Sequence, residues 1–219
     1  MEHKYQTLKL GCYTVNISMS VVGNLPPLLF LTFRSLYGLS YSQLGMLVFI
    51  GFFAQLLIDL VFSFFSHKFD IPKTVKFTPV LTFIGLILYI LSPVIFPDHV
   101  YIGLVIGTLV FASASGLAEV LISPVIAAIP SDNPDREMSK LHSMYAWGVV
   151  GVIIFSTIFL YLFGEKSWPV LTLIFCLLPA FSTYLFFGSE IPELKSEGST
   201  DKISSLFKNK TLWASVLAI

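Results

Sequence analysis

The stretch VYIGLVIGTLVFASASGLAEVLISPVIAAIP, residues 100–130, contains Glu119 as its single charged residue. An α-helix needs about 20 mainly apolar residues to cross the roughly 30 Å hydrocarbon core of a bilayer. The stretch exceeds that length, and it lacks the apolar–polar alternation typical of a barrel strand. It therefore predicts a membrane-spanning helix with one carboxyl group inside it.

Five further apolar runs of sufficient length lie on either side of this stretch. The chain as a whole is 55% hydrophobic and 12% charged, whereas soluble domains are about 45–50% apolar and about 25% charged. We therefore expect an all-α membrane protein with a six-transmembrane-helix bundle. The predicted spans are residues 8–33, 41–65, 74–96, 100–130, 141–163 and 168–188.

The basic residues lie unevenly in the connections between these spans. Eleven of the 13 Lys and Arg residues fall on one side, and only Arg34 and Lys166 fall on the other. Because Lys and Arg are enriched in cytoplasmic connections, we expect a multi-pass protein of the cell (inner) membrane with a cytoplasmic amino terminus. Trp168, at the start of the last span, is interpreted as an interfacial belt residue.

The polar segment after the last span suggests how the chain is organised. We interpret residues 1–188 as a six-span amino-terminal transporter domain and 189–210 as a cytoplasmic linker. Residues 211–219 are apolar but too short to cross a bilayer, so we expect them to begin a seventh span; an interfacial anchor is the alternative. This layout is typical of transporters with two six-helix repeats, and the missing carboxy-terminal six-helix half is then the expected partner.

Glu119 is the first candidate site residue, because a charged side chain at membrane depth is unfavourable by about 2.5–3.5 kcal/mol on insertion scales. Ser115 and Ser123 lie four residues before and after it and share its helix face. Pro124 is expected to kink the helix. We interpret Glu119 as a proton-carrying or substrate-binding carboxylate in a central cavity. A structural carboxylate bonded to a neighbouring helix is the alternative.

A second carboxyl group, Asp59, lies in the span at 41–65, with Gln55 one helical turn before it. The two form a polar stripe together with Gly51. We interpret Asp59 as a gating or coupling residue between helices. The alternative is an acid near the membrane surface, solvated or paired with Lys68 or His142.

Four more polar residues complete the candidate substrate or proton-coupling site. Asn16 and Asn24 share a stripe of the first span, where amides suit sugar hydroxyls or act in helix packing. Asn24 precedes Pro26 and Pro27, which predicts a broken or bent helix. His142 and Tyr145 are three residues apart and share a face of the fifth span; a proton relay and a ligand contact are set against a solvated histidine and a packing tyrosine.

Several classes of function find no support in the sequence. The net charge of +0 does not suggest nucleic-acid binding. No glycine-rich phosphate loop, ligand-spaced His or Cys cluster, or catalytic constellation is present, so we expect no cofactor, no metal and no enzymatic activity. The expected partners are a small-molecule substrate and the lipid bilayer.

Short motifs resemble the major facilitator superfamily, and within it the bacterial fucose/glucose/galactose permease branch. Segment 116–124 looks like the Gly-x-x-Glu-x-x-x-x-Pro of that branch, with Glu119 at the position of its proton-linked glutamate. The connection at 66–74 stands where the superfamily has its cytoplasmic loop signature. Its residues here are His67, Lys68, Asp70 and Lys73.

This resemblance implies the amino-terminal half of a major facilitator superfamily fold, alternating access, and a sugar or related polyol as substrate. One departure is Leu25, which follows Asn24 where the fucose permease type has an aspartate. The leading hypothesis is a proton-coupled secondary transporter, a symporter, for a small polar solute. The alternatives are an uncoupled facilitator or exporter of a more apolar solute, and a non-transporting membrane receptor or assembly protein.

Overall fold

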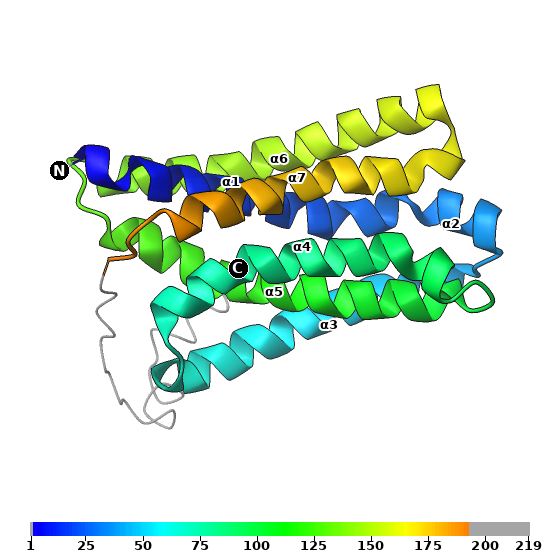
Figure 1. Ribbon diagram of the computed structural model, residues 1–219, viewed down its shortest axis with the longest axis horizontal. Helices are drawn as coiled ribbons and strands as arrows, with labels where there is room; N and C mark the ends of the chain where they lie inside the picture. Colours follow the sequence, from blue (N-terminus) through cyan, green and yellow to red (C-terminus); the bar gives the residue numbers. More distant parts are fainter. Residues whose placement is uncertain (1, 193–219) are drawn as a thin grey trace, which may run out of the picture.

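The computed structural model describes residues 2–192, and every regular element in that range is a helix (Figure 1). Five helices are long and apolar enough to cross a membrane, and the bent pair α1–α2 makes a sixth span. The six-span prediction is therefore confirmed. The elements are α1 Glu2–Leu28, α2 Phe30–Tyr37, α3 Tyr41–Phe65, η1 Ser66–Lys68, α4 Ile71–Ile95, α5 Val100–Ala128, α6 Pro134–Phe163, η2 Glu165–Ser167 and α7 Trp168–Phe187.

The division into domains stays a prediction. Residues 193–210 of the predicted linker and the predicted seventh span at 211–219 lie outside the described residues. Among the described residues, α1, α4 and α6 begin at one end of the bundle (Figure 1). We call it the basic end, because the first turns of α4 and α6 carry Lys73 and Arg136. The opposite end holds α2 and the α6–α7 connection, which contain Arg34 and Lys166.

The first span bends by 47° between α1 and α2. Pro26 and Pro27 occupy the last turn of α1, where each lacks an N–H group and crowds the preceding turn. The chain continues through Leu29, whose N–H donates to the Leu25 carbonyl oxygen at 3.1 Å. The bend that the sequence predicts after Asn24 is confirmed.

Two helices begin earlier than the apolar runs suggest, because capping side chains extend them into polar sequence. The Asp70 carboxylate accepts from the Lys73 N–H at 3.1 Å, so α4 begins at Ile71 and not at 74. The Asn133 side chain accepts from the Arg136 N–H at 3.0 Å, so α6 begins at Pro134 and not at 141. Hydropathy marks the membrane part of a helix, whereas caps mark its end.

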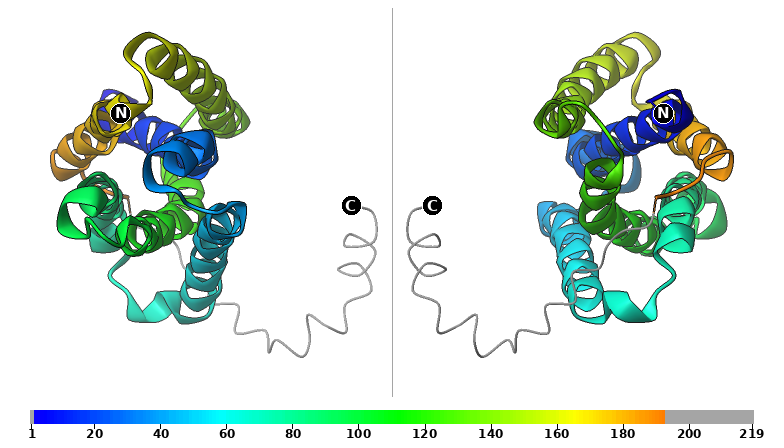
Figure 2. Two further views of the ribbon diagram at one scale, coloured as in Figure 1. Left: turned by 90° about the vertical axis from the view of Figure 1, so that its right-hand side faces the viewer. Right: turned by 90° about the vertical axis from the view of Figure 1, so that its left-hand side faces the viewer.

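The spans pack as two groups of three, α1 with α6 and α7, and α5 with α3 and α4 (Figure 2). The two groups meet where α1 packs on α5 and α4 packs on α7. Exchanging the first three spans with the last three leaves this contact pattern unchanged. Such symmetry is typical of the three-helix repeats nested in transporter halves.

Close approaches between helices occur where glycines remove the side chain. A Cβ atom on Gly107 would lie 2.7 Å from the Tyr89 backbone nitrogen, and one on Gly85 would lie 2.5 Å from that of Phe111. Both contacts join α4 to α5, the pair with the most extensive contact. Small residues therefore allow these backbones to approach.

Aromatic side chains fill the core near the opposite end. Trp168 packs edge-on against Phe33 with ring centroids 5.1 Å apart, and its indole N–H donates to the Tyr37 hydroxyl at 3.0 Å. Its side chain is 1% exposed. The interpretation of Trp168 as an interfacial belt residue is wrong, because the bent α2 brings aromatic partners over it.

Candidate functional site

A cavity of about 520 Å³ lies among α1, α3, α5 and α6. Of these, α1 and α5 are the central helices of the two groups, and α3 and α6 are the least buried of the five straight spans. The arrangement of these helices around the bundle can be followed in Figure 2. Six of the seven residues predicted as a substrate or coupling site line this cavity, and Asp59 is the exception. They are Asn16, Asn24, Gln55, Glu119, His142 and Tyr145.

Glu119 projects from the half of α5 nearer the basic end and is bound to α3. Its Oε2 accepts a hydrogen bond from Gln55 Nε2. Ser115 and Ser123, one turn before and after it, line the same cavity. No described lysine, arginine or histidine forms an ion pair with Glu119. A single uncharged amide is thus the partner of this carboxyl group in the described part of the chain.

Asp59 lies between α3 and α5, one turn nearer the basic end than Gln55. Its Oδ1 is 2.9 Å from where a Cβ atom on Gly116 would be, so the carboxyl group rests against α5 three residues before Glu119. Among the described residues, this buried oxygen has no hydrogen-bond partner. Neither Lys68 nor His142 pairs with it in the structure.

The asparagine side chains of α1 are held by backbone carbonyls. Asn16 Nδ2 donates to the Leu141 carbonyl oxygen of α6 at 2.6 Å, and Asn24 Nδ2 donates to that of Ser20 at 2.8 Å. Both residues line the cavity. Asn16 therefore also ties α1 to α6, as its packing interpretation proposes.

His142 and Tyr145 occupy successive turns of α6 and are both exposed toward the cavity. The Tyr145 hydroxyl lies 3.7 Å from the position that a Cβ atom on Gly23 would take, so the ring reaches across to α1. The structure brings both residues to the same cavity as Glu119.

The predicted loop signature lies apart from the cavity, at the basic end. Lys73 Nζ pairs with Asp70 Oδ2 at 2.7 Å, and Lys68 Nζ stands 5.0 Å from the centre of the Phe65 ring. The hydrogen bond from the Lys73 side chain holds the pKa of Asp70 below its ordinary value. His67 belongs to the short helix η1, and its side chain lies outside the described part of the structure.

A polar cluster between α1 and α6 was missed by the sequence analysis. Glu137 accepts from the Tyr13 hydroxyl at 2.6 Å and pairs with Lys9 Nζ at 3.5 Å and Lys140 Nζ at 3.4 Å. The three-residue spacing of Glu137 and Lys140 was a usable signal. The contacts with Lys9 and Tyr13 join residues more than a hundred positions apart, and no local pattern indicates them.

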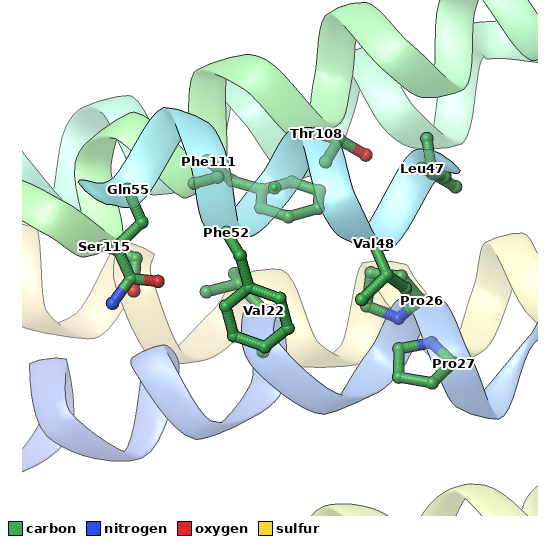
Figure 3. Close-up of a pocket in the computed structure, with 13 residues that line it drawn as sticks. Val22, Pro26, Pro27, Leu47, Val48, Phe52, Gln55, Thr108, Phe111 and Ser115 are labelled. Carbon is green, nitrogen blue, oxygen red and sulfur yellow. The ribbon is translucent and has the colours of Figure 1, made fainter. Parts of the chain in front are cut away.

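A narrow apolar slot was also missed. It lies between α1 and α3, with α5 behind it, and Gln55 and Ser115 stand at one end (Figure 3). Pro26, Pro27 and Leu47 lie toward the other end in the same view. No periodicity in the sequence indicates such a gap, because it depends on how two helices diverge.

No group of three or more His, Cys, Asp and Glu side chains that could hold a metal ion occurs among residues 2–192. The two cysteines, Cys12 and Cys176, are free and buried. The polar groups that converge on the cavity are amides, hydroxyls, one imidazole and one carboxyl group. They are suited to binding a polar solute and to holding a proton.

Comparisons with known proteins agree with this architecture. The inward-open structure of the xylose transporter XylE from E. coli is similar, with a TM-score of 0.68 at 15% identity, over 97% of this chain and 53% of that one. The chain thus spans about half the length of that transporter. None of the curated proteins compared matches the chain. The profile of the Major Facilitator Superfamily matches residues 12–219. The chain therefore belongs to the major facilitator superfamily, a family of membrane transporters and not of enzymes.

Proposed function

We propose that the protein is a secondary active transporter that couples a small polar solute, of the sugar class, to protons by alternating access. The observation that carries the proposal is Glu119, a carboxyl group in a polar cavity between spans, held by Gln55 and without a described cationic partner. Its amino terminus would face the cytoplasm, as the distribution of basic residues indicates.

The lining of the cavity supports a hydroxyl-rich solute. Amides and hydroxyls from α1, α3, α5 and α6 supply both donors and acceptors, which a sugar requires in pairs. The segment at 116–124 resembles the fucose/glucose/galactose permease branch, and the fold is similar to that of a xylose transporter. We place the chain with sugar carriers on these grounds.

The coupling step follows from the position of Glu119. A charge moved within a low-dielectric span is costly, whereas the protonated carboxyl group is neutral. Protonation at Glu119 therefore lets the cavity change its access without carrying a bare charge. Gln55 would keep the side chain directed into the cavity in either state. His142, on the same cavity, would pass protons between Glu119 and the basic end.

A second six-helix half is the proposed partner of this chain. The cavity is flanked by α3 and α6, and the large apolar side chain of Phe52, which lines it, is exposed. A second half packed on this face would enclose the cavity near the membrane midplane, as two-repeat transporters require. Residues 189–210 would link the two halves on the cytoplasmic side.

The test is proton-driven sugar accumulation by Glu119→Gln in proteoliposomes with an imposed pH gradient. We expect accumulation to fall at least about tenfold, because general proton-transfer groups of this kind contribute a hundredfold or more, while exchange without a gradient persists. Glu165→Gln, at the opposite end, is the matched control and should accumulate normally. Accumulation by Glu119→Gln equal to that of the unaltered protein contradicts the proposal.

A second candidate is an uncoupled facilitator or exporter of a more apolar solute. The apolar slot beside the cavity favours it, since its walls offer few hydrogen bonds. The two functions differ in their response to a proton uncoupler. Uptake that an uncoupler abolishes supports the coupled transporter, and uptake that it leaves unchanged supports the facilitator.

A further inference from the structure

The apolar slot is continuous with the polar cavity. Gly23, Phe52, Gln55 and Ser115 line both spaces. All the residues that line the slot lie on α1, α3 and α5, and the slot is open on one side, where Phe52 is exposed. A solute bound in the cavity could therefore extend one substituent into it without leaving this chain.

The slot exists because glycines on α1 and α3 leave space without side chains where the two helices face each other. Gly51 has no side chain there, and a Cβ atom on it would meet Thr108 Cγ2 at 3.4 Å. Gly23 leaves similar space on α1, and Pro26 and Pro27 form the slot wall where the helix begins to bend away. A Cβ atom at position 51 would have no backbone atom of another helix within 4 Å, so we expect a larger side chain there to fill the slot.

The polarity of the slot changes along its length. Gln55 and Ser115 stand at the end that adjoins Glu119, whereas Val48, Leu47 and the prolines stand at the other (Figure 3). The Thr108 hydroxyl oxygen is buried and inaccessible. Placing a hydroxyl group against such apolar walls forfeits its hydrogen bonds. The slot thus selects against hydroxyls and for hydrocarbon.

The size of the slot limits what it can take. Its free volume is about 40 Å³, and on this measure each water-sized group needs about 10–15 Å³. Room therefore exists for about three non-hydrogen atoms, which is too little for an aromatic ring. We infer that the substrate carries a short apolar substituent of about three carbon atoms, which binds in this slot while its polar body occupies the cavity. This inference rests on the proposed function.

A homologous series of n-alkyl β-D-glucosides tests it. Methyl, ethyl, propyl and butyl glucosides are compared as inhibitors of proton-driven glucose uptake by the whole transporter in proteoliposomes. Each buried methylene should strengthen inhibition about fourfold, up to propyl, and butyl should add nothing. Gly51→Val should abolish this dependence on chain length.

Gly45→Val is the matched control, because Gly45 lies on the same helix with nothing within 4 Å of its Cβ position and does not line the slot. It should keep the chain-length dependence of the unaltered protein. If glucose is taken up but all four glucosides inhibit equally, the slot is filled by protein, and the inference is overturned while the proposed function stands. If Gly51→Val keeps the chain-length dependence of the unaltered protein, the inference is also overturned.

If no glucoside inhibits, the result counts against the sugar substrate. A second measurement then tests whether the slot binds a short alkyl group. Ser115→Cys places a thiol where slot and cavity join, while Cys12 and Cys176 are at most 1% exposed. Among the methyl, ethyl, propyl and butyl methanethiosulfonates, the propyl reagent should then react fastest with this thiol. Gly51→Val should remove this preference. Rates that do not depend on chain length overturn the inference.

Discussion

Two helix pairs of this protein occupy equivalent positions in the bundle, but the carboxyl groups between their helices have different numbers of partners. In the α1–α6 pair, Glu137 lies at the basic end and is held by two lysines and a tyrosine. In the α3–α5 pair, Asp59 and Glu119 lie deeper, with Gln55 as the described partner of one and none for the other.

The contrast lies in how many partners hold each carboxyl group. A carboxylate with several charged or hydroxyl partners is stabilised in its ionised form and fastens two helices together. A carboxyl group with a single amide partner lacks this stabilisation. On the proposed function, the first arrangement holds two helices together, whereas the second would exchange protons.

The largest effect is expected from filling the closest contact in each pair. Gly116→Ala would place a Cβ atom 2.8 Å from the Gln55 backbone oxygen, which cannot rotate away, and should cost about 2–3 kcal/mol. Gly148→Ala meets the Ser20 hydroxyl, which can rotate, and should cost about 1 kcal/mol. Thermal unfolding in detergent measures both.

The control for this pair is Gly151→Ala, whose Cβ position has nothing within 4 Å. It should be neutral or stabilising, since alanine favours a helix over glycine by about 1 kcal/mol. Equal losses of unfolding free energy for Gly116→Ala and Gly148→Ala would show that the two interfaces accommodate an added Cβ atom equally well.

Glu137→Gln should lower the free energy of unfolding by about 1–2 kcal/mol, because hydrogen bonds to a charged group are worth more than neutral ones. Two lysines would lose their countercharge. Thermal unfolding measures the loss, and proton-driven accumulation should persist in the folded fraction. A variant that unfolds normally but fails to accumulate would assign Glu137 to coupling.

The same isosteric change at Asp59 should act with the opposite sign. Asp59→Asn removes a charge whose buried oxygen has no described partner, so we expect a gain of about 1 kcal/mol. Unfolding of the Asp59→Asn, Glu137→Gln and double variants forms the comparison. A loss of stability on Asp59→Asn would contradict this expectation.

The smallest effect is expected at the cap of α4. Asp70 has its pKa lowered by Lys73, so its contribution is complete above the ordinary aspartate pKa of about 3.9. It is lost as the pH falls through the lowered folded-state value. Asp70→Asn should therefore reduce the unfolding temperature slightly at pH 6, and the difference should vanish in strong acid. Asp132→Asn, in the α5–α6 connection, is the control and should show no such difference.

The sequence predicts the spans well because membrane insertion depends on local hydropathy. The predicted runs at 41–65 and 100–130 agree with α3 and α5 to within two residues. The bend after Asn24 was also predictable, since two adjacent prolines cannot keep the helix straight. The early starts of α4 and α6 were missed because Asp70 and Asn133 cap polar turns outside the apolar runs.

The candidate site was predicted in part. Charged and amide residues inside apolar runs are costly, and this alone singles out Glu119, Gln55 and the asparagines. It does not tell which of them meet. Glu119 and Gln55 lie 64 positions apart, and Asp59, on the same stripe, turns out to face α5 and not the cavity.

By itself, the sequence determined six membrane-spanning runs within residues 2–192, with one carboxyl group inside the fourth. Hydrophobic length and the cost of a buried charge act residue by residue, so they can be read without a fold. Only the tertiary structure decided that Glu137 fastens α1 to α6, that Gln55 holds Glu119, and that a slot opens beside Gly51. These depend on the distance between helices, which is set by the packing of all six at once.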